Sequence, residues 1–357
     1  MFKCDALPVR ALNYARKEHV LSYVALRMMM SSVQCREKLS WLGRFVERNI
    51  NRFDSKSYAK YYKYKSIDGG VVEARECKFP KPSVALAESY VLYLLSSSSA
   101  VPMQENVYSY RWPKSDMSCQ NYDYFFNGYL ERERNVSAAL MANNLGCAVI
   151  CDIKTFYPTV DMSTLSSLAC DLVCRSVVDP NVKSVVCKYI ENYCHIHGGG
   201  LPIGPALSHV LAQIYLSHLD RQLIAAYGAR YFRYVDDIIV VCSRNDADNV
   251  ARHIDCVVQG EGLSLNDGKT VRYFSNIWKS PALDRKEMYT ENFESFMQIL
   301  GAYLVFHSDK YDELLVMLKG EGFNIPLSQL RSLSKYNKYV QFVLGQFRKN
   351  SSIVWKA

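Results

Sequence analysis

The chain has 357 residues, of which 49% are hydrophobic and 22% are charged, and its net charge is +8. These proportions are those of an ordinary folded protein. Met1 to Arg10 lacks the apolar segment of a signal peptide, and no stretch approaches the roughly 18 apolar residues of a membrane span. Twelve cysteines without a Cys-x-x-Cys pair indicate reduced thiols, so we expect a cytoplasmic protein that does not bind membranes.

The positive charge is concentrated in two segments. Residues 36–65 carry nine basic and three acidic side chains, and residues 331–357 carry six basic and no acidic ones. Two basic segments around a slightly acidic middle predict a surface for a polyanion, although solvated helix faces would give the same counts. The candidate nucleic-acid-binding residues are Arg44, Arg48, Arg52, Lys56, Lys60, Arg331, Lys335 and Lys338.

The first five of these residues are spaced four apart, so we expect them to form one basic stripe on a single helix. Tyrosines 58, 61, 62 and 64 interleave with its end and could stack on unpaired bases. A second helix, over about 327–347, would carry Arg331, Lys335 and Lys338 and could grip a duplex backbone. A plain surface helix explains this basic pattern nearly as well.

Hydrophobic periodicity and turn residues predict the order of the elements. Helices are expected at about 1–30, 83–95, 121–144, 163–177, 181–193, 206–227 and 247–259. Strands are expected at 148–153, 231–234 and 238–242, with a further strand and turn over 262–270. This order predicts an α+β fold, in which a small antiparallel sheet of the split-βαβ type is backed by helices.

Three carboxylates stand out against this framework. Asp236 and Asp237 lie at or beside the tip of the predicted hairpin, and Asp152 comes at the end of an apolar strand. We expect them to meet at one edge of the sheet, where they could hold two Mg²⁺ ions, with Mn²⁺ as a substitute, for phosphoryl transfer. An ordinary turn would explain an isolated Asp-Asp pair, but the distant Asp152 favours the metal site.

Basic residues precede the acidic strand, where a nucleotidyltransferase would place cations for an incoming triphosphate. Arg111 and Lys114 lie beside aromatic residues in a short extended segment, 108–114, for which a surface hairpin is the alternative. Arg132 and Arg134, on the helix predicted at 121–144, are weaker candidates for the same role. Further along, the glycine-rich turn 198–205 would let the backbone approach a base pair or a phosphate closely.

Taken in order, these segments resemble the palm of a reverse transcriptase. Asp152-Ile153-Lys154-Thr155-Phe156-Tyr157 is similar to motif A of that family, and Gly200-Leu201-Pro202-Ile203-Gly204-Pro205-Ala206-Leu207-Ser208 is similar to motif B. Tyr234-Val235-Asp236-Asp237 resembles motif C, and Gly262-Leu263-Ser264-Leu265-Asn266 with Lys269-Thr270 resembles motif D. The resemblance covers about residues 108–274.

The resemblance implies an RNA-directed DNA polymerase with a right-hand fold. Its expected regions are a helical basic N-terminal region with the start of the fingers (1–100), fingers and palm (101–275), and a primer grip with a reduced helical thumb (276–357). The metal ligands would be Asp152, Asp236, Asp237 and the backbone of Ile153. The nucleotide would contact Phe156, Tyr157, Ile203 and Gly204 besides Arg111 and Lys114.

Two of these roles have a physical argument beside the resemblance. The ring of Tyr157 would collide with a 2′-OH and so favour deoxynucleotides, unless it is simply an aromatic core residue. Lys269 would lie near the leaving pyrophosphate as a general acid or electrostatic partner, unless it is an ordinary solvated lysine.

One departure from the family pattern narrows the resemblance. Ile203 stands where motif B usually has Gln, and the resulting Pro-Ile-Gly-Pro-x-x-Ser pattern is similar to that of bacterial abortive-infection and defence-associated reverse transcriptases. That group implies phage defence, with dNTPs, a non-coding RNA template and a DNA product, and a homo-oligomer or partner defence protein. A template-independent or protein-primed polymerase and a catalytically idle RNA-binding scaffold remain the alternatives. The roughly 80 residues after motif D lead us to expect no nuclease or integrase domain.

Overall fold

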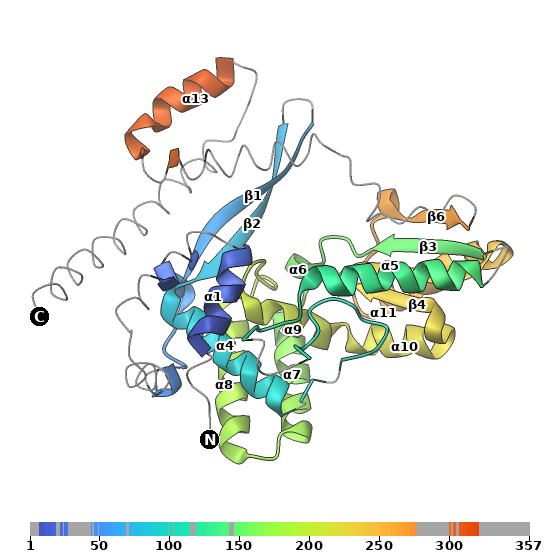
Figure 1. The fold of residues 1–357 in the computed structure, drawn as a ribbon, viewed down its shortest axis with the longest axis horizontal. Helices are drawn as coiled ribbons and strands as arrows, with labels where there is room; N and C mark the ends of the chain where they lie inside the picture. Colours follow the sequence, from blue (N-terminus) through green and yellow to red (C-terminus); the bar gives the residue numbers. More distant parts are fainter. Residues whose placement is uncertain are drawn as a thin grey trace, which may run out of the picture. The chain divides into compact units, whose positions relative to one another are not determined.

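The computed structural model describes residues 50–320 except 69–70, 99, 102, 115–118, 143–145, 276–299, 301–302 and 305–306. Before residue 50 it describes residues 7–18, 22–23, 25–27, 44 and 46–48. The chain forms two compact units (Figure 1). One unit comprises Met1–Tyr90, Pro202–Pro205 and Lys286–Ala357, and the other comprises Val91–Leu201 and Ala206–Arg285.

The second unit is built on a four-stranded antiparallel sheet with the strand order β4-β5-β3-β6. β3 (Gly146–Asp152) lies between β5 (Asp237–Ser243) and β6 (Val271–Phe274), and β4 (Tyr231–Tyr234) forms a hairpin with β5. β3 and the β4–β5 hairpin therefore fall where the sequence predicts them. The strand predicted within 262–270 does not, because that segment contains only an isolated bridge from Leu265 to Ile153 and a 3₁₀ turn, and β6 begins after it at Val271. The predicted fold class, α+β with an antiparallel sheet and helices, is confirmed.

Helices cover this sheet because its central strands are apolar on both faces. From α5 (Phe125–Met141), Val136 and Leu140 pack against Ala148 of β3 and against β4 and β5. Side chains alternate along a strand, so Cys147, Val149 and Cys151 point away from α5, and all three are fully buried. α11 (Ala247–Gly260) contacts β3 and β5 as well. A short, continuously apolar strand is typical of this two-sided burial.

A helical hairpin follows β3 after the single turn α6 (Phe156–Thr159). α7 (Met162–Ser176) begins at the N-cap Asp161, whose carboxylate accepts a hydrogen bond from the Thr164 N–H, and α8 (Pro180–Ile196) begins with proline after the N-cap Asp179. Single turns of 3₁₀-helix connect the other elements of this unit: η4 (Gly228–Arg230), η5 (Arg244–Asp246) and η6 (Asp267–Lys269).

The single long helix predicted over 206–227 is instead two helices, α9 (Ala206–Tyr215) and α10 (Ser217–Tyr227). Leu216 interrupts them with ψ at 0°, while the Leu216 N–H still bonds to the Ala212 carbonyl and the Asp220 N–H to the Leu216 carbonyl. No Pro or Gly marks the position, and the fully buried Leu216 side chain gives no polar signal. The prediction was wrong because tertiary packing, rather than local propensity, sets this break.

The first unit contains α1 (Leu7–Glu18) and a long hairpin of β1 (Tyr58–Asp68) and β2 (Val71–Pro80), followed by α4 (Pro82–Ser97), which continues into the other unit. η2 (Ser55–Ser57), η7 (Ser308–Lys310) and α13 (Tyr311–Gly320) complete its described elements. Tyr58 is buried and its hydroxyl donates to Glu88, at 2.8 Å, which ties β1 to α4. Among the described residues, no helix is long and apolar enough to cross a bilayer.

The expectation of one basic helical stripe from Arg44 to Lys60 was wrong. Arg44 and Arg48 are helical, but Lys56 lies in η2 and Lys60 lies on β1. The stripe ends because Asp54 and Ser57 exchange capping hydrogen bonds, after which a tyrosine-rich segment, a composition that favours strands, forms β1. Arg331, Lys335, Lys338 and the predicted thumb helix lie outside the described residues.

Candidate active site

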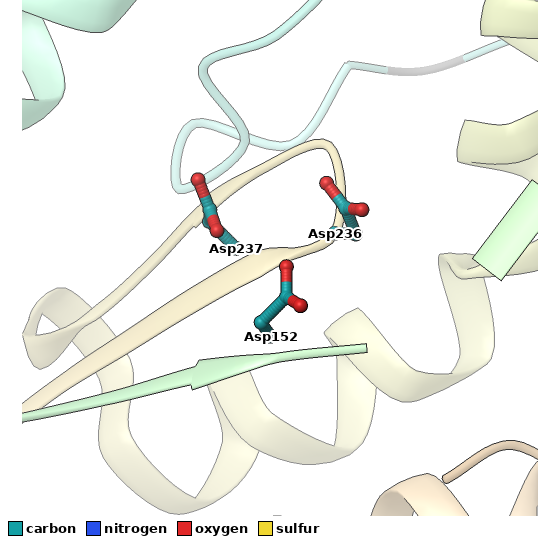
Figure 2. A group of neighbouring side chains, drawn as sticks. All are labelled: Asp152, Asp236 and Asp237. Atoms are coloured by element: carbon teal, nitrogen blue, oxygen red, sulfur yellow. The ribbon is translucent and has the colours of Figure 1, made fainter. Parts of the chain in front are cut away.

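The register of the sheet brings the three predicted carboxylates together. Asp152, at the end of β3, pairs directly with Asp237, the first residue of β5. The Ile153 N–H donates to the Asp236 carbonyl at 3.1 Å, which extends the pairing into the hairpin turn. One carboxylate oxygen of each Asp lies within 4.8 Å of the others (Figure 2). Residues more than 80 positions apart thus meet at one edge of the sheet.

The cluster has the chemistry of a divalent metal site. All three side chains supply hard oxygen donors, which Mg²⁺ and Mn²⁺ prefer. Desolvation raises the pKa of Asp237, with a smaller contribution from the negative charge of Asp152, whereas Arg132 opposes the shift. A raised carboxyl pKa marks a site that gains from additional positive charge. These residues could therefore hold a divalent metal ion.

Lys269 and Asn266 hold Asp152 from the motif D segment. The Lys269 ammonium lies 3.0 Å from Asp152 Oδ2, and Asn266 Nδ2 lies 3.3 Å from the same oxygen. The Lys269 side chain is 59% exposed, and its hydrogen bond to Asp152 raises the pKa of the ammonium. The lysine is thus charged at neutral pH, at the cluster, and accessible to a ligand.

Arg132 supplies a second cation, opposite Asp237. Its guanidinium lies 3.8 Å from Asp237 Oδ2, is only 4% exposed, and pairs with the buried Glu133 at 2.9 Å. The rings of Tyr129 and Tyr234 lie 4.9 and 5.4 Å from its guanidinium carbon. The sequence placed this arginine only among weaker candidates for the triphosphate, and the structure places it beside a carboxylate.

The turn that presents Asp236 is strained. Val235 has φ of 56°, a left-handed conformation that β-branched residues rarely adopt and that costs about 1–3 kcal/mol. Two side chains hold its peptide groups. The Val235 N–H donates to Ser109 Oγ at 3.0 Å, and the Val235 carbonyl accepts from the Arg233 guanidinium at 2.8 Å.

Arg233 belongs to a fully buried polar network that the sequence analysis missed. Its Nε and a terminal nitrogen donate to Asp220 Oδ1 and Oδ2 at 2.6 and 2.5 Å, and the Tyr231 hydroxyl donates to Oδ1 at 2.6 Å. Burial alone would lower the pKa of Arg233, but the Asp220 carboxylate more than offsets it and raises that pKa. A charged residue inside the apolar segment 231–241 was the signal, because a buried charge requires a partner.

The predicted nucleotide contacts in this unit occupy different environments. Phe156 and Tyr157 are 2% and 9% exposed, and the Tyr157 hydroxyl hydrogen-bonds His209 Nδ1 at 2.8 Å. Arg111 donates to Glu131 and to the carbonyls of Val107 and Glu105, and lines a cavity of about 1200 Å³ that the three carboxylates do not line. Lys114 is exposed. The donors of Arg111 are therefore engaged within the protein.

Ile203 and Gly204 lie in the first unit. The Lys78 N–H donates to the Ile203 carbonyl at 2.7 Å, and the Tyr14 hydroxyl donates to the Gly204 carbonyl at 2.9 Å. Gly204 has φ of 112°, and a Cβ there would lie 2.3 Å from the Lys78 carbonyl oxygen. The glycine thus permits a close approach between two backbone segments of the protein itself.

The predicted nucleic-acid-binding residues that the structure describes are all exposed: Arg44, Arg48, Arg52, Lys56 and Lys60. Lys60 pairs with Glu76 at 3.0 Å.

Comparison with known protein families decides the identity of this fold. The family model described as "Reverse transcriptase (RNA-dependent DNA polymerase)" matches residues 92–302, more than half of the chain. The chain belongs to the reverse transcriptase family. The match spans β3, the β4–β5 hairpin and the segment of Lys269, and so contains all three carboxylates.

The family model describes RNA-dependent DNA polymerases, and enzymes with this domain use divalent metal ions. Among solved structures the chain is similar to apo telomerase from Candida tropicalis, with 13% identity and a TM-score of 0.38 over 60% of this chain and 44% of that chain. It is also similar to telomerase from Candida albicans in complex with a fragment of telomeric RNA, with 12% identity and a TM-score of 0.40 over 67% of this chain and 46% of that chain. The chain thus spans less than half of these telomerase chains. No curated protein matches it in sequence.

Proposed function

We propose that this reverse transcriptase is the DNA polymerase of a bacterial antiphage defence system and that it adds dNTPs through a two-metal centre formed by Asp152, Asp236 and Asp237. The observation that carries the proposal is the approach of three carboxylate oxygens to within 4.8 Å of one another. A protein that only bound RNA would have no need for this costly cluster of negative charge.

Each residue has a distinct task in this proposal. The three carboxylates and the Ile153 backbone would hold two Mg²⁺ ions, with Mn²⁺ as a substitute, and bound ions would supply charge stabilisation at the attacking 3′-oxygen and the leaving pyrophosphate. The Lys269 ammonium, 3.0 Å from Asp152, neutralises or protonates the pyrophosphate as it departs. Tyr157, whose ring lies against that of Phe156 with a centroid distance of 5.5 Å, favours deoxynucleotides by excluding the 2′-OH.

The defence role rests on motif B. The pattern Pro202-Ile203-Gly204-Pro205 with Ser208 resembles the abortive-infection group, from which we infer a cytoplasmic enzyme that copies a bound non-coding RNA into DNA. Exposed basic residues of the first unit (Arg44, Arg48, Arg52 and Lys56) are available for an RNA backbone. Ile203 in place of Gln favours a second candidate, a template-independent or protein-primed polymerase, because it removes a polar contact near the nascent base pair.

Purification from cells followed by sequencing of the copurifying nucleic acid tests the proposal. The protein is then given Mg²⁺ and all four dNTPs, before and after ribonuclease treatment. A defined RNA with a complementary DNA product that is lost after ribonuclease supports templated synthesis. A homopolymer, repeat or random product that survives ribonuclease supports the second candidate.

The metal site is tested with the double variant Asp236→Asn/Asp237→Asn, which is expected to abolish incorporation. Asp171→Asn is the matched control, because Asp171 is 69% exposed and lies on α7, where it pairs loosely with Arg175 at 4.0 Å. Incorporation that persists in the double variant would contradict the catalytic assignment.

A further inference from the structure

We propose that Ser109 and the buried Arg233–Asp220 ion pair are positioning residues that hold the strained turn at Val235 and thereby keep Asp236 and Asp237 opposite Asp152. This inference rests on the proposed metal site and assigns the residues that assemble it. None of the three positioning residues belongs to the carboxylate cluster itself. Each would act only through the backbone of the turn.

The geometry gives both peptide groups of Val235 a side-chain partner. Ser109 Oγ accepts the N–H at 3.0 Å, and the Arg233 guanidinium donates to the carbonyl at 2.8 Å. Without a partner on each side, a valine backbone would relax from φ of 56° toward a negative φ. A change of that size at Val235 would rotate the peptide leading to Asp236.

Both partners are themselves fixed. Ser109 is fully buried, and its carbonyl accepts from Gln213 Nε2 at 2.5 Å. Its segment runs along β4, with hydrogen bonds of 2.9 Å from the Arg233 N–H to Asn106 and from the Tyr108 N–H to Arg233. Arg233 is locked by its two hydrogen bonds to Asp220 from α10. Ser109 and Arg233 thus hold the turn directly. Gln213 of α9 and Asp220 of α10 hold those two residues in place.

The turn joins two paired strands, because Tyr234 at the end of β4 pairs with Asp237 at the start of β5, and Val235 and Asp236 lie between them. β5 pairs with β3 from Asp237 onward, and Asp236 is tied to β3 through its carbonyl and the Ile153 N–H. Val235 lies between the paired residues Tyr234 and Asp237, so its conformation decides the direction in which the chain enters the pair Asp236–Asp237. Catalytic and metal-binding side chains must be held within about 0.5 Å of their productive geometry.

The test compares Ser109→Ala in two backgrounds, wild type and Val235→Gly. Glycine adopts positive φ without strain. At position 235 it should therefore hold the turn without the hydrogen bond to Ser109, while leaving the carboxylates in place. Substitution of Arg233 or Asp220 would leave a buried charge unpaired and destabilise the fold, so neither is used. Tyr193→Phe is the control, because it removes a different fully buried hydroxyl hydrogen bond, to Ser208, far from the turn in sequence.

Two quantities are measured on the full chain. One is the dissociation constant for Mn²⁺ alone, from calorimetric titration without nucleotide. The other is the hydrogen-exchange rate of the peptide that contains Val235, followed by mass spectrometry. Ser109→Ala is expected to weaken Mn²⁺ binding about tenfold, in line with the loss of a buried hydrogen bond, and to speed exchange at the turn. In the Val235→Gly background the same substitution is expected to weaken Mn²⁺ binding by at most about twofold, and Tyr193→Phe is expected to change neither quantity.

The proposal is overturned if Ser109→Ala weakens Mn²⁺ binding equally in both backgrounds, or leaves binding and exchange unchanged. Failure of the proposed function has a different signature. If the wild type binds no Mn²⁺, or Asp236→Asn binds it as well as the wild type does, the metal site is wrong. The exchange rate at Val235 then decides separately whether Ser109 holds the turn.

Discussion

The buried ion pair between Asp220 and Arg233 gives the sharpest prediction about stability. Asp220→Asn removes the negative charge that receives three hydrogen bonds of 2.5–2.6 Å, while the Arg233 and Asp220 side chains are 1% and 2% exposed. The substitution leaves the charge of Arg233 uncompensated in the interior. Removing one partner of a buried ion pair typically lowers the free energy of unfolding by about 3–5 kcal/mol. The asparagine oxygen can still accept the two hydrogen bonds made to Oδ1, from Tyr231 and from Arg233 Nε, so we expect a loss of about 3 kcal/mol, at the lower end of this range.

Urea unfolding, followed by the fluorescence of the four tryptophans, measures this loss. Asp171→Asn is the matched control, because its partner Arg175 is 82% exposed and the loss of such a surface pair costs less than about 1 kcal/mol. The double variant Asp220→Leu/Arg233→Met tests the cause, because it removes both charges and is expected to be far more stable than the sum of the single effects predicts. Additive single effects, or a loss below about 1 kcal/mol for Asp220→Asn, would refute the reasoning.

Three further predictions concern other parts of the chain. Gly128→Ala is expected to lower the melting temperature, because its Cβ would lie 2.0 Å from the Tyr108 carbonyl oxygen, whereas Gly260→Ala, with nothing within 4 Å, is expected to leave it unchanged or raise it. Hydrogen bonds from Ser163 and Thr164 lower the pKa of Asp161 to about 2 from its ordinary 3.8. The ionised group therefore stabilises the fold above about pH 4 and loses that contribution as the pH falls through 2. In Asp161→Asn, the free energy of unfolding should lack this part of its acid dependence. Lys269→Met is expected to lower kcat for dNTP incorporation about 10²-fold with little change in KM, and Lys188→Met, on an exposed position of α8, is expected to leave both unchanged.

The sequence by itself predicted the strand and the hairpin that bear the three carboxylates. A short apolar run before Asp152 predicts a strand buried on both faces, and two apolar runs around Asp236 and Asp237 predict a hairpin, because side-chain period and burial are local properties of the chain. The order of the four motifs then indicated the reverse transcriptase family, which the match over residues 92–302 confirms. Local patterns also gave a wrong prediction, because the regular basic spacing from Arg44 to Lys60 indicated one helix, whereas Lys56 lies in η2 and Lys60 on β1.

Only the tertiary structure decided the register of the strands and the contacts between side chains of different elements. The pairing of Asp152 with Asp237 depends on strand register, and a shift of one residue would turn each side chain to the other face. The contacts of Arg132 with Asp237, of Ser109 with Val235 and of Arg233 with Asp220 join segments from different elements. Neither propensity nor periodicity specifies such contacts, because their energy comes from burying charged and polar groups together once the sheet and its helices have packed.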